Sequence, residues 1–276
     1  MNTEVSPIVF GTVEVSDPRF ENDGLRCVTV KSPALAQRAD ITVHVPPAAA
    51  DGAGVPLVIL LHGVYGSHWA WALKGGAHRT HLRLQRDEGL PPFVLAMPSD
   101  GLWGDGSGYL PHRTQDFERW IVSEVPAAVA HAAPAVTAAS PVFIAGLSMG
   151  GFGALRLAGK YPEKFRAASA HSALTTFSRM KDFVEESLGT FTALEEDRSV
   201  LDTLLRSRAR LPALRFDCGT DDPLLADNRA LHAALTEAGI AHSYEEFPGG
   251  HEWPYWENHF ADTLRFFARS LTQKST

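Results

Sequence analysis

Apolar runs and helix-like repeats alternate along this chain, and their order changes near residue 56. Short runs of β-branched and apolar residues between turn-forming residues predict strands. These runs cover residues 8–15, 25–31, 41–45, 56–63, 92–98, 141–147, 165–171, 213–219 and 242–247. Segments with apolar residues three or four positions apart predict helices. These segments cover residues 81–89, 116–132, 149–161, 224–239 and 256–272.

The order of these elements predicts an α/β fold. From residue 56 onward strands alternate with helices, which is typical of a mostly parallel sheet with helices on both faces. The earlier strands are separated by short turns, so we expect them to form an antiparallel N-terminal edge. The central sheet should then have about eight or nine strands. We expect residues 1–276 to form a single domain, because the Pro/Ala/Gly-rich residues 46–56 indicate a surface loop and not a linker.

One long segment breaks the alternation. Residues 172–212 lie between two predicted strands and carry mixed helical signals. A crossover does not need so many residues, and long insertions often border binding sites. We therefore expect residues 172–212 to form a cap over a ligand pocket.

Composition and charge mainly exclude partners. The chain has 276 residues and a formal net charge of −7, which argues against a nucleic-acid or anionic-membrane partner. No apolar run is long enough to span a membrane, and the N-terminus lacks the features of a signal peptide. We expect Cys27 and Cys218 to be reduced, buried thiols of a cytoplasmic protein, although a disulfide and a homo-oligomer both stay open.

The sequence carries no convincing metal or cofactor motif. It has no H-E-x-x-H, no C-x-x-C and no complete calcium loop. The glycines of residues 104–108 neither follow a strand directly nor open a helix, so they are not a dinucleotide fingerprint. We therefore expect no cofactor and no metal.

Ser148 stands where a predicted strand meets a predicted helix. It is the centre of Gly146-Leu147-Ser148-Met149-Gly150, a G-x-S-x-G pattern. In this context the pattern is typical of a nucleophile elbow, a strained turn that exposes a serine hydroxyl above a sheet. The alternative is a glycine-rich helix start with Ser148 as its N-cap. A cap requires none of these glycines, each of which costs a helix about 1 kcal/mol.

Two backbone N–H groups are candidates for an oxyanion hole. The N–H of Met149 lies at a helix start, where free N–H groups and the helix dipole favour negative charge. The second donor should come from the loop after strand 56–63, and there we choose Val64. Gly63 should let the backbone approach the substrate, and His62 should hold this loop by hydrogen bonding.

A catalytic serine needs a base, and the base needs an orienting acid. After a nucleophile elbow, the acid is expected to follow a late strand. Asp221 and Asp222 both follow strand 213–219. We prefer Asp222, because Gly219 and two further residues let the turn carry its carboxylate over the strand end. Asp221 is the alternative, and either residue could instead cap the helix that follows.

His251 is the preferred base among the twelve histidines. It lies in a loop after strand 242–247 and before the last predicted helix, where the histidine of such a triad is expected. His171 follows a strand but precedes the acid in the sequence. His171 could line the pocket, or it could be a buried polar residue whose hydrogen bonds are satisfied.

Several aromatic residues near these motifs are candidates for a substrate pocket. They are Trp69, Trp103, Tyr109, Trp253 and Trp256. Together with Gly63 and His171 they could surround a short or aromatic acyl group. Alternatively, the aromatic side chains only pack the loops onto the sheet.

These motifs together resemble the esterase D-like branch of the α/β-hydrolases, which includes S-formylglutathione hydrolases, tributyrin-type esterases, feruloyl esterase domains and mycolyltransferases. The resemblance is carried by LLHGVYGSHWAW, MPSDG, DFERWIVSEVPAAV, IAGLSMGGFGALRLAGKYPEKF, CGTDDPLLADNRALHAAL and FPGGHEWPYW, between residues 56 and 257. It implies an α/β-hydrolase fold with a Ser148–Asp222–His251 triad. It also implies that the N–H groups of Val64 and Met149 are the oxyanion donors.

We therefore expect a serine carboxylesterase that hydrolyses small acyl esters through an acyl-enzyme. The sequence departs from these relatives at residues 100–113 and in the cap, so its substrate stays open. Alternatives on the same triad are acyl transfer and hydrolysis of S-formylglutathione, for which Lys74, Arg79 and Arg113 could form a basic patch. An alternative of another class is a catalytically silent hydrolase fold that only binds a ligand.

Overall fold

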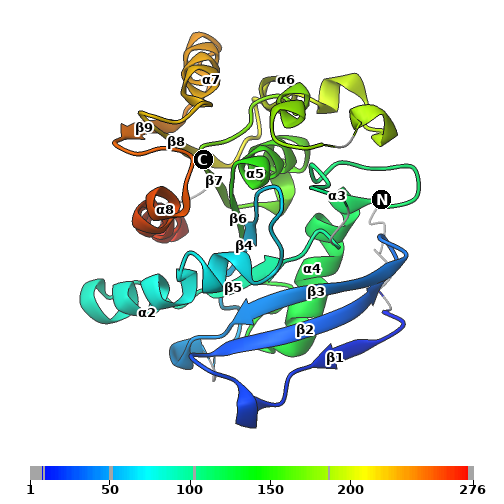
Figure 1. Cartoon of the computed structure of the whole chain (residues 1–276). Helices are drawn as coiled ribbons and strands as arrows, with labels where there is room; N and C mark the ends of the chain where they lie inside the picture. Colours follow the sequence, from blue (N-terminus) through cyan, green and yellow to red (C-terminus); the bar gives the residue numbers. More distant parts are fainter. Residues whose placement is uncertain (1–7, 9, 50–51, 102–103, 186, 273–276) are drawn as a thin grey trace.

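A nine-stranded sheet forms the centre of the computed structural model, which describes residues 8, 10–49, 52–101, 104–185 and 187–272 (Figure 1). The strands are β1 (Val13–Val15), β2 (Leu25–Ser32), β3 (Gln37–His44), β4 (Leu57–Leu61), β5 (Val94–Pro98), β6 (Val142–Leu147), β7 (Ala167–His171), β8 (Ala213–Gly219) and β9 (Ser243–Phe247). They lie side by side in the order β1-β2-β3-β5-β4-β6-β7-β8-β9.

The sheet is antiparallel at its N-terminal edge and parallel elsewhere. β1, β2, β3 and β5 pair with their neighbours in antiparallel fashion, and every pair from β5 to β9 is parallel. The predicted mixed sheet is thus confirmed. β3 is longer than the predicted strand 41–45, because it pairs with β2 along its whole length, from Gln37 to His44. β1 keeps only the end of the predicted strand 8–15.

Helices cover both faces of the sheet (Figure 1). They are α1 (Ala70–Leu73), α2 (Ala77–Glu88), α3 (Phe117–Arg119), α4 (Val125–Ala132), α5 (Met149–Lys160), α6 (Val200–Arg206), α7 (Leu225–Glu237) and α8 (Trp253–Thr272). A π-helical stretch, η3 (Trp120–Glu124), joins α3 to α4. α2 starts before the predicted segment 81–89. Its N-cap is Gly76, a glycine in the left-handed conformation that makes no side-chain cap, so the usual side-chain signal for a helix start is missing.

The buried residues of β4 show how the sheet divides the core. Leu57, Ile59 and Leu61 belong to a cluster with α4, α5, α6 and α7. Val58 and Leu60 belong to a second cluster with α1, α2 and α8. Because successive side chains of a strand point to opposite faces, this strand is apolar throughout and is buried on both sides.

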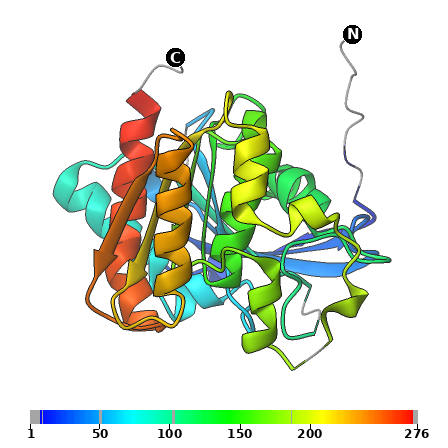
Figure 2. The same ribbon diagram turned by 90° about the horizontal axis from the view of Figure 1, so that it is seen from above.

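The segment 172–212 contains three short 3₁₀ helices and α6. The 3₁₀ helices are η5 (Phe177–Asp182), η6 (Leu188–Thr190) and η7 (Glu195–Asp197). An isolated bridge between Thr176 and Ser199 joins its two arms, and another joins Phe191 to His112. In Figure 2 this yellow-green segment lies outside the sheet, next to the green loop that precedes α3. We call residues 172–212 the cap.

The parallel strands end at the same edge of the sheet. Leu61 of β4 is in register with Gly146 of β6, and Gly219 of β8 with Phe247 of β9. The loops that follow these strands are therefore gathered at one edge, where open α/β sheets bind their ligands. None of the described helices is long and apolar enough to cross a membrane.

Candidate active site

Ser148 occupies a strained turn between β6 and α5. Its φ is 54° and its ψ is −119°, a backbone conformation that L-residues rarely adopt. The turn is held by the Ser148 N–H, which donates to the His171 carbonyl at 3.0 Å, and by the Leu174 N–H, which donates to the Ser148 carbonyl at 3.2 Å. The Ser148 side chain makes no capping hydrogen bond to α5. The alternative interpretation as an N-cap is therefore wrong.

The glycines around Ser148 are required by close backbone packing. A Cβ on Gly150 would lie 2.6 Å from the His62 carbonyl oxygen and closer still to that of Leu61. A Cβ on Gly146 would lie 2.9 Å from the Cα of Gly150 and closer to its carbonyl group. These neighbours are backbone atoms that cannot turn aside. The elbow can form only because both positions lack a side chain.

His251 connects Ser148 to Asp222. Its Nε2 lies 2.9 Å from Ser148 Oγ, and its Nδ1 lies 2.9 Å from Asp222 Oδ2. An ionised carboxylate can only accept, so the Nδ1–H donates to Asp222, and Nε2 is left to accept the Ser148 hydroxyl proton. The Asp222 side chain is fully buried and its Oδ1 accepts the Leu224 N–H at 2.8 Å. The carboxylate is thus fixed from both oxygens.

Asp221, the alternative acid, points elsewhere. It is exposed, and its N–H donates to the Gly249 carbonyl at 2.9 Å. This contact ties the loop after β8 to the loop after β9. Gly219 contributes to the same approach, since a Cβ there would lie 2.8 Å from the carbonyl carbon of Gly249. The two loops therefore meet, and Asp222 is the aspartate that reaches His251.

Residues 62–66, which we call the oxyanion loop, pass directly beside Ser148. A Cβ on Gly63 would lie 3.4 Å from Ser148 Cβ. His62 stabilises this loop as predicted, because its Nδ1 donates to the Gly63 carbonyl at 2.7 Å while its Nε2 accepts the Asp100 N–H at 3.3 Å. The side chains of Val64 and Met149 both pack against Gly106.

The N–H groups of Val64 and Met149 are available to a ligand. Within the part of the chain that the structure describes, neither donates a hydrogen bond to a protein acceptor. The Met149 N–H belongs to the first turn of α5, where the helix dipole favours an anion. The two candidate donors thus flank Ser148 from the oxyanion loop and from α5.

Two aromatic rings flank His251. The Trp256 ring stands edge-on to the imidazole with centroids 5.0 Å apart, and its Nε1–H donates to Ser172 Oγ at 3.3 Å. On another side, the Phe183 ring of the cap lies 5.5 Å from the imidazole centroid. Phe183 was not predicted from the sequence, because the mixed helical signals of residues 172–212 do not indicate which side chain faces the site. The expectation that the cap borders the site provides the only signal.

The other predicted pocket residues differ in their positions. Trp253 packs edge-on against Trp256, at 5.4 Å between centroids, and so belongs to the aromatic group beside His251. Trp69 is 39% exposed at the start of α1. Tyr109 is completely buried and donates its hydroxyl to the His62 carbonyl at 3.0 Å, so it has no surface for a substrate. Trp103 lies outside the described residues.

His171 is a buried core residue and not part of a pocket wall. Its Nδ1 lies 2.8 Å from Asp217 Oδ2 and its Nε2 lies 2.9 Å from Thr263 Oγ1, with no exposed surface. Burial alone would raise the pKa of the Asp217 carboxyl, but His171 and Arg215 outweigh it and lower this pKa to about 2. The expectation that His171 lines the pocket is therefore not supported, and its alternative interpretation applies.

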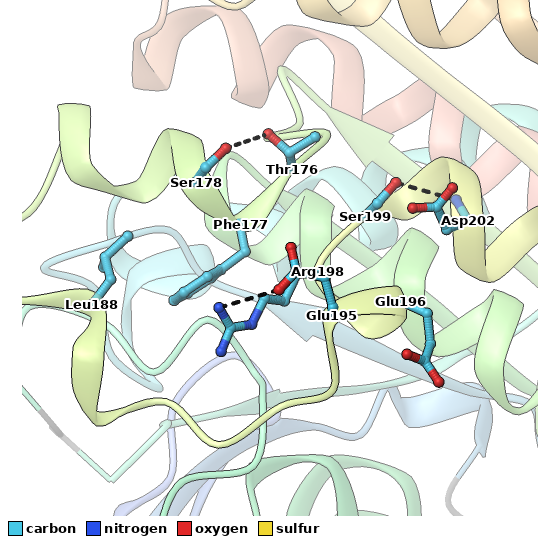
Figure 3. Close-up of a pocket in the computed structure, with 9 residues that line it drawn as sticks. All are labelled: Thr176, Phe177, Ser178, Leu188, Glu195, Glu196, Arg198, Ser199 and Asp202. Atoms are coloured by element: carbon cyan, nitrogen blue, oxygen red, sulfur yellow. Dashed lines mark hydrogen bonds and ion pairs between the residues drawn. The ribbon is translucent and has the colours of Figure 1, made fainter.

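Two cavities lie away from Ser148. One, of about 600 Å³, is in the cap (Figure 3) and is lined by Thr176, Phe177, Ser178, Leu188, Glu195, Glu196, Arg198, Ser199 and Asp202. The other, of about 570 Å³, includes Lys74 and Arg79 of the predicted basic patch, but not Arg113. Neither contains a residue of the predicted triad. Among the described residues no group of His, Cys, Asp and Glu side chains could hold a metal ion.

Comparison with known proteins agrees with the sheet and the site. The family model Esterase matches residues 32–267. The chain is 27% identical to the acetyl esterase of Caldicellulosiruptor saccharolyticus over 238 residues, which are 79% of this chain and 85% of that enzyme. The resemblance to esterases is thereby confirmed.

Solved structures show the same fold. A ferulic acid esterase superposes with a TM-score of 0.75 at 24% identity, over 94% of this chain and 98% of that one. The S-formylglutathione hydrolase from Agrobacterium tumefaciens gives a TM-score of 0.75 at 21% identity, over 96% of this chain and 100% of that one. The predicted α/β-hydrolase fold is therefore confirmed.

Proposed function

Because the chain belongs to the Esterase family and is a carboxylic ester hydrolase, we propose that it is a serine esterase for small acyl esters, with Ser148, His251 and Asp222 as its catalytic triad. The single observation that carries this proposal is a pair of 2.9 Å hydrogen bonds at His251, which accepts from the Ser148 hydroxyl and donates to the Asp222 carboxylate. They provide a nucleophile with a base, and a base with an orienting acid.

In the first half of the reaction the enzyme is acylated. His251 Nε2 takes the Ser148 proton while Oγ attacks the ester carbonyl carbon. The carbonyl oxygen becomes an oxyanion that accepts hydrogen bonds from the N–H groups of Val64 and Met149. The C–O bond to the leaving group then breaks, and His251 gives its proton to the departing alcohol. Asp222 stabilises the imidazolium while it exists.

In the second half a water molecule repeats the sequence. His251 takes a proton from the water, whose oxygen attacks the acyl carbon, and the same two N–H groups hold the oxyanion. The bond to Ser148 Oγ breaks, Oγ recovers its proton from His251, and the carboxylic acid leaves. The strained turn at Ser148 serves both halves, because it keeps Oγ beside the imidazole without a conformational change.

Short acyl groups are the proposed substrates. The rings of Phe183 and Trp256 stand within 5.5 Å and 5.0 Å of the His251 ring, so both bulky side chains approach the reacting atoms. The relative with 27% identity is named an acetyl esterase. Acetyl esters are therefore the first substrates to test.

The test combines a substrate series with a probe. Purified wild-type enzyme and Ser148→Ala should be compared on nitrophenyl esters of acetate, butyrate and octanoate, and on S-formylglutathione, with a fluorophosphonate probe alongside. We expect hydrolysis to be fastest with acetate, and Ser148→Ala to lose both hydrolysis and labelling while it keeps its fold. A folded Ser148→Ala variant with near-normal hydrolysis would remove Ser148 from the mechanism.

The same experiment separates the alternatives. Faster turnover of S-formylglutathione than of any ester would favour the thioester hydrolase. A new ester formed on addition of an acceptor alcohol would favour acyl transfer. A wild-type protein that neither hydrolyses esters nor reacts with the probe would instead be a ligand-binding hydrolase fold.

A further inference from the structure

Tyr109 lies buried between the oxyanion loop and α5. Its hydroxyl donates to the His62 carbonyl oxygen at 3.0 Å, and its ring centroid lies 5.9 Å from that of the His62 ring. On the other side the ring packs against α5, where a Cβ on Gly153 would lie 2.7 Å from Tyr109 Cδ2. The side chain therefore fills the space behind the oxyanion loop and makes its one polar contact with that loop.

The oxyanion loop needs such a contact because Gly63 is flexible. Without a Cβ, the two peptide planes that meet at Gly63 rotate more freely than at any other residue. The second plane is fixed by its carbonyl, which accepts from His62 Nδ1 at 2.7 Å and from the Gly66 N–H at 3.2 Å. In a trans peptide the Val64 N–H points away from that carbonyl. Both donors to the Gly63 carbonyl belong to residues 62–66, so they fix the Val64 N–H relative to the oxyanion loop. Its direction relative to Ser148 therefore depends on how the loop is anchored in the core.

The first of these planes carries the His62 carbonyl, which is the acceptor of Tyr109. Tyr109 is itself held firmly, although it has a left-handed φ of 53°. Its carbonyl accepts from Nη2 of Arg156 at 2.6 Å, and its N–H donates to Ser107 Oγ at 3.1 Å. Arg156 is fully buried in α5 and pairs with Glu118. A rigid element of the core is therefore connected to the oxyanion loop through one phenol.

We propose that Tyr109 is a positioning residue, whose hydroxyl aims the Val64 N–H at the reacting carbonyl by fixing the peptide plane between His62 and Gly63. This inference rests on the proposed function, in which Val64 is an oxyanion donor. Burial raises the pKa of the Tyr109 hydroxyl well above its usual value, and nearby Asp100 adds to this rise. The phenol is therefore neutral at neutral pH and acts there as a hydrogen-bond donor.

The test is Tyr109→Phe with Tyr161→Phe as its matched control. Both substitutions delete one hydroxyl from the same group of residues, since Tyr161 donates to Glu118 Oε2 at 2.9 Å. Only Tyr109 contacts the oxyanion loop. On nitrophenyl acetate we expect Tyr109→Phe to lower kcat about tenfold and leave KM within about twofold, because a misaimed oxyanion donor weakens only the transition state. Tyr161→Phe should keep kcat within about twofold.

A second measurement does not depend on activity. Amide hydrogen exchange of residues 62–68, followed by mass spectrometry, should be faster in Tyr109→Phe than in the wild type and unchanged in Tyr161→Phe. The inference is overturned if exchange in this segment is equal in all three proteins. It is also overturned if the two variants lose kcat equally and in step with their melting temperatures.

The proposed function fails in a different way. If Ser148→Ala were as active as the wild type, the triad would be wrong, whatever the exchange data show. If the wild type is active, Ser148→Ala is inactive and Tyr109→Phe keeps full kcat, the triad stands and only the role of Tyr109 is lost.

Discussion

The Phe183 ring lies next to the His251 imidazole in a tilted arrangement, with 5.5 Å between the ring centroids and an angle of 31° between the planes. Phe183 belongs to the cap, whereas His251 belongs to the loop after β9. The cap therefore contributes a side chain to the surroundings of His251. Because Trp256 approaches the same imidazole edge-on, two aromatic rings border the side chain of His251.

Phe183→Ala should weaken substrate binding more than catalysis. The substitution removes an aromatic wall but no hydrogen bond of the predicted triad. We expect KM for nitrophenyl acetate to rise about 3- to 10-fold, which corresponds to roughly 1 kcal/mol for a lost aromatic contact. The value of kcat should stay within about threefold of the wild type.

The control for this prediction is Phe20→Ala, because that ring is 83% exposed in η1 (Pro18–Phe20). It should change neither constant. In Phe183→Ala, kcat/KM for esters with longer acyl chains should rise relative to that for the acetate ester, since the pocket becomes larger. An unchanged KM together with a lost kcat would show that Phe183 acts on the imidazole and not on the substrate.

Asp222→Asn and Asp221→Asn form a matched pair that tests the choice of acid. An amide at position 222 can still accept the Leu224 N–H, so the loop should keep its shape. It no longer supplies a charge to hold the Nδ1–H of His251. We expect kcat to fall by about 10³-fold or more for Asp222→Asn, and to stay within about twofold for Asp221→Asn. A larger loss for Asp221→Asn would reverse the assignment.

Gly150→Ala should destabilise the fold, although alanine is the better helix former. In an open helix this change would stabilise by up to about 1 kcal/mol. Here the new Cβ would lie 2.6 Å from the His62 carbonyl oxygen, which belongs to the backbone of the oxyanion loop. We expect a loss of about 2 kcal/mol or more in the free energy of unfolding.

The measurement is urea-induced unfolding, with esterase activity recorded on the same samples. Gly189→Ala is the control, because a Cβ there would meet only Ser187 Oγ at an ordinary 3.5 Å. It should stay within about 0.5 kcal/mol of the wild type. A Gly150→Ala protein of unchanged or higher stability would show that the close packing at the elbow does not exist in solution.

The sheet and the elbow could be predicted because their causes are local. An apolar run such as β4 is buried on both faces whatever surrounds it, and the glycines around Ser148 are needed for a turn made by neighbouring residues. Asp222 and His251 could be placed because parallel strands end at one edge, so the loops that follow them must meet.

The pocket could not be predicted in the same way, because contacts between residues far apart in the sequence decide which side chains face it. Tyr109 looks like a wall residue in the sequence, yet its φ of 53° directs it into the core. His171 follows a strand like a site residue, but its partner Thr263 comes from α8. Phe183 reaches His251 only through the irregular path of the cap. No periodicity in the sequence indicates these side-chain contacts.

A buried pair of histidines should make the fold sensitive to mild acid. His44 of β3 and His81 of α2 have no exposed surface, and their ring centroids lie 5.5 Å apart. Burial lowers the pKa of His44 to about 3, with a further contribution from His81, and burial lowers the pKa of His81 to about 4. In the unfolded chain both groups return to a pKa near 6.5.

Between pH 6.5 and 4, His44 and His81 are therefore protonated in the unfolded chain but stay neutral in the folded chain. Because the unfolded chain binds more protons, the free energy of unfolding falls as the pH is lowered. The slope is about 1.4 kcal/mol per pH unit for each histidine at its steepest. Asp217, with a folded pKa of about 2, adds to this loss of stability only below its unfolded value of 3.8. In the window above pH 4 the loss of stability therefore comes from histidines and not from that carboxylate.

His81→Gln isolates one of the two groups. The Gln amide oxygen can still accept the Phe93 N–H, which donates to His81 Nε2 at 3.2 Å. Urea-induced unfolding should be followed at pH 7.5, 6.5, 5.5 and 4.5 in both proteins. As the pH is lowered, the free energy of unfolding should fall less steeply in the variant than in the wild type. Below pH 6.5 the difference between the two slopes should be roughly 1 kcal/mol per pH unit. If the free energies of unfolding of the wild type and the variant fall in parallel down to pH 4.5, His81 has the same pKa in the folded and the unfolded chain. Its burial would then not lower its pKa.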